Sequence, residues 1–221
     1  MNICGSKSIS EAARKVLAGY PYLEEYMTLR IINNRALARA IYRDVRRECG
    51  EVKLQSVVTA VRRFPISKTK SERNKILKIL SESEVNLRYD IGVATIMLDS
   101  EVPKKLDELR REIGEETYML IQGIQTLTIV AEERLLSLFE KLFNGKIAEI
   151  KRGLALIVVM SPKEIIRTPG VIAHLASILA LEKINVVEMM SSHTETSFIV
   201  EERDALRAIE VIRNEIKRVR R

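Results

Sequence analysis

"GIQTLTIVAEE" (residues 123–133) and "HTETSFIVEER" (residues 193–203) carry the same pattern at an offset of 70 positions. The identical pairs at this offset are Thr126 and Thr196, Ile129 and Ile199, Val130 and Val200, and Glu132 and Glu202. Self-similarity at a fixed offset indicates two copies of one supersecondary unit. We therefore predict that this part of the chain is a structural repeat.

The elements predicted around these segments follow the order β-α-β-β-α in both copies. Aliphatic and β-branched runs alternate with stretches of helical periodicity. In the first copy we predict strands over 87–98 and 117–130, the latter divided at Gly123, and helices over 102–113 and 132–143. In the second copy we predict two strand-like stretches over 146–160 broken at Gly153, strands over 185–190 and 196–202, and helices over 171–184 and 204–219.

This order of elements is that of the ferredoxin-like split βαβ fold, in which two helices cover one face of a four-stranded antiparallel sheet. The second copy ends in a helix and has no fourth strand of its own. The two copies must therefore share or exchange a strand. We place the first domain at residues 85–151 and the second at residues 152–221.

The residues before the repeat are predicted to be helical. A helix over 37–47, Gly50 and a second helix over 54–63 have the layout of a helix-turn-helix. We predict an all-α, helix-turn-helix-like module over 1–66 and a connecting helix over 67–84. The predicted fold class is therefore α+β, with this helical module followed by two ferredoxin-like βαββα(β) domains.

Positive charge is concentrated in the first part of the chain. Residues 1–84 contain 17 Lys and Arg against 9 Asp and Glu, whereas residues 85–221 contain 20 against 21. This asymmetry favours an anionic partner for the N-terminal region only.

Side chains suited to nucleic-acid contact lie on the two helices of the predicted helix-turn-helix. Arg and Gln recognise guanine and adenine edges, and Ser and Thr bond to bases or phosphates. Arg residues at i, i+4 spacing repel one another unless an anionic partner is present. DNA binding is one hypothesis for this module, and a solvated basic face is the alternative. The candidate DNA-binding residues are Arg35, Arg39, Arg43, Arg47, Gln55, Ser56, Thr59, Arg62 and Arg63.

Catalytic machinery is not recognisable in the sequence. There is no nucleophile–base pair and no Gly-rich phosphate loop. His174 and His193 lack the nearby Cys or paired carboxylates of a zinc site. We therefore expect no catalytic residues, no metal and no cofactor, and we expect that the chain is not an enzyme.

The sequence also lacks the signals of a membrane or secreted protein. Its longest apolar stretch, Leu154–Met160, is far shorter than a membrane span, and the first residues lack the apolar core of a signal peptide. Cys4 and Cys49 form no CxxC pair and no disulfide framework. A cytoplasmic location without membrane contact is expected.

Three stretches of the second copy carry a resemblance to a known family. They are Thr168-Pro169-Gly170-Val171 at a helix start, Ile184-Asn185-Val186 at the entry to the next strand, and the hairpin from Met190-Ser191-Ser192 to Thr196-Ser197-Phe198-Ile199-Val200. This set resembles the ACT domain, most closely the tandem ACT regulatory tail of aspartokinases. The similarity of the first copy rests mainly on the repeat. With no Gly-rich kinase segment before it, the pair resembles the sensor half of such an enzyme joined to a helical module, as in stand-alone archaeal ACT proteins that are predicted regulators of amino-acid metabolism.

The resemblance implies a ligand site. In the ACT family a small ligand, usually an amino acid, binds between the loop after the first strand of one domain and a partner domain across an interface. Free N–H groups at a helix start favour a carboxylate, and Asn185 offers both a donor and an acceptor. The candidate ligand-binding residues are Arg167, Thr168, Pro169, Gly170, Val171, Asn185 and Val186.

The junction itself is suited to such a ligand in three ways. Thr168 is a good N-cap, Pro169 suits the first helical position, and Gly170 lets a ligand approach the backbone. Arg167 stands where family members often have a short polar residue, and it either clamps a carboxylate or blocks the pocket. The alternative is that Pro-Gly is only a tight turn. The equivalent loop of the first copy, residues 99–105, has no Gly and is less suited to a ligand.

Two functional hypotheses follow. In the first, a non-catalytic regulator senses an amino acid through its ACT-like half and contacts DNA through its helical half. In the second, an amino-acid-binding regulatory subunit controls a partner enzyme through protein contacts. An unrecognised enzyme is the third and weakest hypothesis. Because ACT-like sheets usually pair edge to edge, the resemblance also implies a homodimer.

Overall fold

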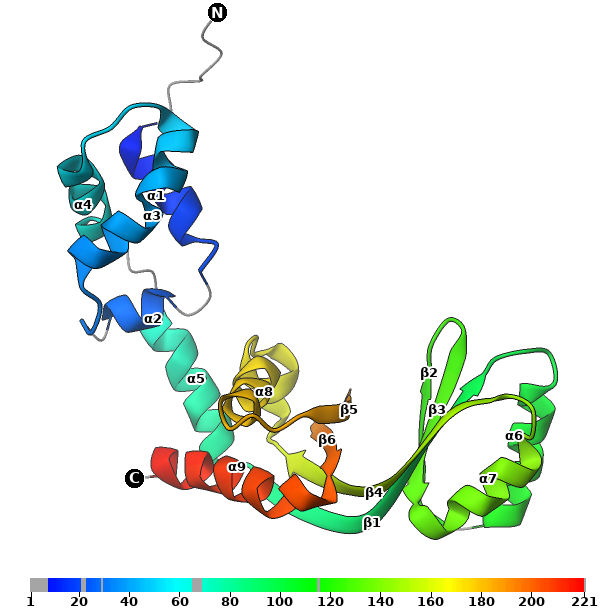
Figure 1. Cartoon of the computed structure of the whole chain (residues 1–221). Coiled ribbons are helices and arrows are strands. Elements are labelled where there is room, and N and C mark those ends of the chain that lie inside the picture. Colours follow the sequence, from blue (N-terminus) through cyan, green and yellow to red (C-terminus); the bar gives the residue numbers. More distant parts are fainter. Residues whose placement is uncertain (1–7, 21–22, 29, 65–68, 115, 221) are drawn as a thin grey trace, which may run out of the picture. The chain divides into compact units, whose positions relative to one another are not determined.

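A computed structural model describes residues 8–20, 23–28, 30–64, 69–114 and 116–220 (Figure 1). The chain divides into two compact units, residues 1–73 and residues 74–221. The first unit is made of helices, and the second is an antiparallel sheet with helices. The predicted α+β class is confirmed.

The helices of the first unit pack around one aliphatic core. α1 (Ile9–Leu17) begins with a capping box, because the Ser8 hydroxyl accepts from the Glu11 N–H while the Glu11 carboxylate accepts from the Ser8 N–H. α2 (Leu23–Thr28) follows. The buried residues of this core are Ala12, Ala13, Leu17, Leu23, Met27, Ala38, Ile41, Val45, Val57, Val58, Ala60, Val61 and Phe64.

α3 (Asn34–Cys49) and α4 (Leu54–Arg62) are the two helices predicted for the middle of this unit. The Asn33 side chain caps α3 by accepting from the N–H groups of Arg35 and Ala36. Gly50 ends α3 with φ of 85°, a conformation that favours glycine. The Tyr42 hydroxyl then donates to the Val52 carbonyl at 2.7 Å and holds the turn before α4.

α5 (Thr69–Ser81) is the predicted connecting helix. Its last part, from Asn74 on, belongs to the second unit, where Ile79 and Leu80 are buried. The boundary predicted between residues 66 and 67 lies outside the described residues.

The second unit is built on a six-stranded antiparallel sheet of order β2-β3-β1-β4-β6-β5. Its strands are β1 (Glu84–Met97), β2 (Met119–Gln122), β3 (Thr126–Glu132), β4 (Ile147–Met160), β5 (Val186–Ser192) and β6 (Glu195–Glu201). Its helices are α6 (Val102–Ile113), α7 (Leu136–Leu142), α8 (Val171–Leu181) and α9 (Ala205–Arg220). Three 3-10 segments, η1 (Glu133–Leu135), η2 (Lys163–Arg167) and η3 (Glu202–Asp204), precede α7, α8 and α9.

The two copies exchange strands, as predicted. The last part of β1, from Ile91, pairs with β3 in the first copy, while its first part, Glu84–Arg88, pairs with β4 beside the strands of the second copy. β4 does the reverse, because its pairing with β6 begins only at Leu154. Figure 1 shows β1 and β4 running as a pair from one helical pair to the other. Each copy therefore completes its four strands with a segment of the other copy's long strand.

The predicted break at Gly153 is wrong, since β4 continues through it from Ile147 to Met160. Gly153 has φ of 64°, and its N–H donates to the Glu133 carboxylate at 2.7 Å. The β1–β4 register shifts between Arg88 and Ile91 and again between Ile91 and Val93. A glycine at positive φ here forms a bulge that bends the strand instead of ending it.

Three aliphatic clusters hold the second unit together. α6 and α7 cover the strand face that includes Ile96 and Ile129, and α5, α8 and α9 cover the face that includes Ile157 and Phe198. Neighbouring strand residues point to opposite faces, so a third cluster lies on the strand faces turned away from these helices. Because both copies contribute to this third cluster, their inner faces pack against each other. Its buried members are Ile91, Val93, Val130, Leu154, Leu156 and Ile199.

The repeat is real, but its predicted offset of 70 is wrong by one residue for the hairpin strands. In the sheet, β1 pairs Val93 with Val130, and β4 correspondingly pairs Leu156 with Ile199. Val130 is thus equivalent to Ile199, an offset of 69. A one-residue slip exchanges the two faces of a strand. At an offset of 70, Ile129 of the helix-covered face would be matched with Ile199 of the inner face.

Candidate functional site

The segment between β4 and α8 is an ordered junction. Ser161, which is buried, donates its N–H to the Thr194 carbonyl at 2.9 Å, and its hydroxyl accepts from the Ser83 hydroxyl at 3.0 Å. η2 then turns the chain with Ile165 buried beneath it. These contacts anchor the junction to the end of the sheet where β4 finishes.

α8 begins at Val171, and among the described residues no side chain accepts from the N–H groups of its first turn. The prediction that Thr168 is its N-cap is wrong, because the Thr168 hydroxyl donates back to the Glu164 carbonyl at 2.8 Å. Gly170 stands at the cap position with φ of 95°. The first intrahelical bond runs from the His174 N–H to the Gly170 carbonyl. An α-helix leaves its first N–H groups without intrahelical partners, so the start of α8 is an uncapped set of donors.

The candidate ligand residues fall into two places. Arg167, Pro169 and Gly170 are exposed beside the start of α8, with Thr168 half-buried and Val171 buried. Asn185 and Val186 lie at the opposite end of α8, where β5 begins. Since α8 has 11 residues, these two groups are separated by about 16 Å of helix. One chain therefore brings together the residues at 167–171 but not Asn185.

A buried hydroxyl that is not among the candidate ligand residues lies on the same half of the sheet. Thr196 is fully buried, and its Oγ1 has no hydrogen-bond partner among the residues that the structure describes. It pairs with Val159 and Ser191, near the end of β4 from which the junction leaves the sheet. Buried polar groups are normally hydrogen-bonded, so Thr196 is an exception within the described part of the sheet.

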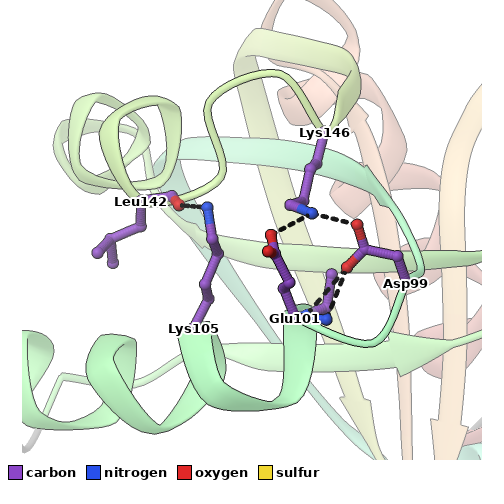
Figure 2. A network of polar contacts seen from close by, with 6 residues as sticks. Asp99, Glu101, Lys105, Leu142 and Lys146 are labelled. Atoms are coloured by element: carbon purple, nitrogen blue, oxygen red, sulfur yellow. Dashed lines mark hydrogen bonds and ion pairs between the residues drawn. The ribbon is translucent and has the colours of Figure 1, made fainter.

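The first copy satisfies its own helix start. The Asp99 carboxylate accepts from the N–H of Glu101 at 2.9 Å and from the N–H of Val102 at 3.2 Å, where α6 begins. Lys146, which follows α7, bonds both to Asp99 and to Glu101, and Figure 2 shows it reaching over the two carboxylates. Lys105 donates to the Leu142 carbonyl at 2.7 Å in the same view. A carboxylate held by a cation thus fills this site.

The charges of this network reinforce one another. The hydrogen bond from Lys146 is the main cause that holds the pKa of Asp99 and the pKa of Glu101 below their ordinary values. In turn, its bond to Asp99 raises the pKa of Lys146. The three side chains therefore stay ionised over a wide pH range.

The two helix starts are equivalent in the repeat. The first intrahelical bonds, from Lys105 to Glu101 in α6 and from His174 to Gly170 in α8, again differ by 69 positions. Asp99 is therefore equivalent to Thr168. An Asp three residues before a predicted helix is a recognisable turn signal, whereas its pairing partner Lys146 lies 47 residues away and has no local signal.

A second polar contact joins α8 to α9. His174 Nε2 lies 2.8 Å from the Glu215 carboxylate, which also accepts from Arg218 at 2.6 Å. Burial raises the pKa of Glu215, but the hydrogen bonds from Arg218 and His174 outweigh it and lower that pKa. This contact fixes the first turn of α8 against α9.

The candidate DNA-binding residues of α3 form one exposed row. Arg35, Arg39 and Arg43 have no ion-pair partner within the part of the chain that the structure describes. Arg47 differs, because its guanidinium pairs with Asp44 at 3.1 Å.

The candidates of α4 also share one face. Gln55, Thr59, Arg62 and Arg63 are exposed and Ser56 is half-buried, while Val57, Val58 and Val61 face the core. The Thr59 hydroxyl donates to the Gln55 carbonyl at 3.0 Å within the helix. The structure thus places the predicted polar residues away from the core.

The junction and the strands around it match a known family. Residues 149–214 match the ACT domain. This part of the second unit is therefore similar to the ACT domain. This match covers β4, α8, β5, β6 and most of α9, and with them the uncapped start of α8. No curated protein matches the chain by sequence.

Solved structures share the fold of the tandem ACT pair. The regulatory subunit of aspartate kinase from Thermus thermophilus is 18% identical with a TM-score of 0.50, over 59% of this chain and 95% of that one. The subunit from Thermus flavus is 16% identical with a TM-score of 0.51, over 59% and 95%. Aspartate kinase from Synechocystis is 17% identical with a TM-score of 0.53, over 62% of this chain but only 27% of the kinase. The fold is therefore that of tandem ACT regulatory domains.

Two kinds of feature are absent from the described residues. No helix among them is long and apolar enough to cross a membrane. Across the same residues, no three His, Cys, Asp or Glu side chains gather where they could hold a metal ion.

Proposed function

We propose that this protein is a ligand-sensing regulator whose second ACT domain binds a small carboxylate, most simply an amino acid, at the start of α8. The contrast between the two copies carries this proposal. At the start of α6 the chain supplies its own carboxylate, Asp99. At the equivalent start of α8 no side chain caps the helix, and Thr168 is bonded elsewhere.

Each candidate residue has a defined part in this proposal. The N–H groups of the first turn of α8 receive the carboxylate, since a helix start attracts negative charge. Gly170 takes the φ of 95° with which the chain enters α8, a conformation that favours glycine. Arg167 is exposed at the end of η2 and clamps the carboxylate from outside. Asn185 comes from a second copy of the chain, because its own copy holds it at the far end of α8.

Control of a partner enzyme is the mode of regulation that we favour. The fold shared with the isolated regulatory subunits of aspartate kinase supports it, since the chain covers 95% of each of the two. Ligand binding would act by favouring one arrangement of the protein according to its differential affinity. Amino-acid metabolism is the proposed context.

The ligand proposal is tested by thermal unfolding of the full chain with each proteinogenic amino acid at millimolar concentration. A ligand at about 100 times its Kd adds roughly 2.7 kcal/mol to the stability of the folded state. Arg167→Gln should weaken the binding of the amino acid that stabilises the protein, whereas Lys163→Gln, an exposed cation of the same segment, should not. If no amino acid shifts the unfolding temperature, the proposal is rejected. If Arg167→Gln binds the amino acid more tightly than the wild type, Arg167 blocks the site instead of holding the carboxylate.

DNA binding by the helical unit is a second candidate function, and the arginine row of α3 favours it. Each phosphate contact should lower log K by about 0.9 per unit of log salt concentration. We therefore propose titrating duplex DNA at several salt concentrations with Arg35→Gln/Arg39→Gln and, as a charge-matched control, Lys104→Gln/Lys163→Gln. This function is supported if only Arg35→Gln/Arg39→Gln lowers the affinity for DNA and makes the dependence of log K on log salt concentration less steep. Weak binding that is equal in all proteins rejects it.

A further inference from the structure

A cavity of about 400 Å³ lies between the beginning of β1 and the last turns of α9. Its lining residues are Ser83, Glu84, Val85, Asn86, Arg213, Ile216, Lys217 and Arg220. It shares no residue with the start of α8 or with the Asp99 network. Its volume falls within the usual range of small-molecule sites.

Three cations of the cavity lie along one face of α9. Arg213, Lys217 and Arg220 are separated by four and three residues, so they project from successive turns on the same side. Glu84 is the one acidic residue of the lining. The cavity wall therefore carries a net positive charge.

These cations are not neutralised by the protein. Arg213 and Lys217 are exposed and have no carboxylate within ion-pair distance across residues 69–114 and 116–220. The Arg220 guanidinium donates to two neutral carbonyls, those of Ser81 at 2.7 Å and Ser83 at 3.1 Å. These bonds fix Arg220 in place, and no carboxylate of residues 69–114 and 116–220 forms an ion pair with it.

The helix dipole explains only part of this charge. Cations in the last turn of a helix are stabilised by the dipole, which applies to Lys217 and Arg220. Arg213 lies two turns before the end of α9, beyond the range of that effect. Like charges four residues apart destabilise a helix, and a bound anion would reverse the sign of that interaction.

The open edge of β1 supplies the opposite wall. Over Glu84–Arg88, β1 pairs with β4 only, since its pairing with β3 begins at Ile91. Asn86 adds an amide that can donate to an anion. We propose that this cavity binds a small phosphorylated metabolite, with its phosphate groups on Arg213, Lys217 and Arg220.

Titration calorimetry of the full chain with inorganic pyrophosphate at low salt tests this site. Arg213→Gln/Lys217→Gln should weaken pyrophosphate binding by at least about tenfold. Arg111→Gln/Lys104→Gln removes the same two kinds of charge from exposed positions of α6 outside the cavity and should change the affinity by less than about twofold. Titration with ADP then separates the sources, because tighter binding than pyrophosphate assigns a nucleotide and equal binding assigns the phosphate groups alone.

A local readout excludes general attraction to a basic protein. Backbone amide resonances of Val85, Asn86 and Ile216 should shift with saturation during the pyrophosphate titration. The proposal is overturned if pyrophosphate fails to saturate the protein, if both double variants lose affinity equally, or if those resonances stay in place while others shift.

Discussion

The carboxylate of Asp99 fills, at the start of α6, the position that Thr168 leaves unfilled at the start of α8. Asp99 accepts from the N–H groups of Glu101 and Val102, whereas the Thr168 hydroxyl donates to the Glu164 carbonyl. The repeat thus contains its own comparison between an occupied and an open helix start. The chain itself supplies the acceptor at the start of α6, and we propose that a ligand supplies it at the start of α8.

Removal of the internal carboxylate should open the first helix start. Asp99→Ala deletes the acceptor of two backbone N–H groups, so the variant should unfold at a lower urea concentration than the wild type. Acetate should restore part of the lost stability in Asp99→Ala and should have no such effect on the wild type. Ser100→Ala, a neighbouring exposed position, is the control and should unfold like the wild type.

The same network predicts a pH dependence of stability. The pKa values of Asp99 and Glu101 are held below their ordinary 3.8 and 4.5 by Lys146. Carboxylates with a lowered pKa stabilise the folded state above the ordinary value, and this stabilisation is lost as the pH falls through the folded-state pKa. Lys146→Met should therefore be less stable than the wild type at pH 7, and the difference should shrink below about pH 4. Urea unfolding at a series of pH values measures it, and a constant difference would contradict this account.

The repeat and its order of elements were predictable from sequence because they depend on local patterns. The exact pairing of the copies was not. Strands buried on both faces are continuous apolar runs, so Ile129 and Ile199 look alike although one faces helices and the other faces the inner cluster. Gly153 misled the prediction for a related reason. A glycine in a strand can mark an end or a bulge, and only the neighbouring strand decides which.

The candidate site was predictable in position and less so in detail. The residue types at positions 167–171 predicted a helix start, and a helix does start at Val171. The sequence did not predict the capping correctly, because that depends on the path of η2. In the structure the Thr168 hydroxyl donates to the Glu164 carbonyl, four residues before it, and does not cap α8. The cavity beside α9 brings together residues more than a hundred positions apart, and no local pattern marks it.

Gly170→Ala should reduce both stability and ligand binding. The backbone at Gly170 has φ of 95°, and an added Cβ would lie 3.0 Å from Ile76 Cδ1. An L-residue in this region is destabilised by about 1–2 kcal/mol, which urea unfolding would resolve. Gly145→Ala, at φ of 76° with open space around it, separates backbone strain from crowding and should leave amino-acid affinity unchanged.

In the first copy the small residue Gly92 packs against the large residue Leu136, and the second copy has different residues at the equivalent positions. A Cβ on Gly92 would lie only 2.5 Å from Leu136 Cδ1 and 2.7 Å from its Cγ. The equivalent residues of the second copy are Ala155 and Ala205, both fully buried. One copy thus has a glycine close to a leucine at these positions, and the other has two alanines that belong to one buried cluster.

This difference between the copies predicts that substitutions of Gly92 and Leu136 have non-additive effects on stability. Gly92→Ala alone overpacks the contact and should lose about 1–3 kcal/mol, and Leu136→Ala alone leaves a cavity and should lose about 2–5 kcal/mol. Gly92→Ala/Leu136→Ala recreates the pairing of the second copy, so its loss should be smaller than the sum by at least about 1 kcal/mol. Leu175→Ala, in the other helix-covered core, should combine additively with Gly92→Ala. Urea unfolding of the single and double variants gives the coupling energy, and additivity of Gly92→Ala with Leu136→Ala would show that the two copies do not substitute for one another.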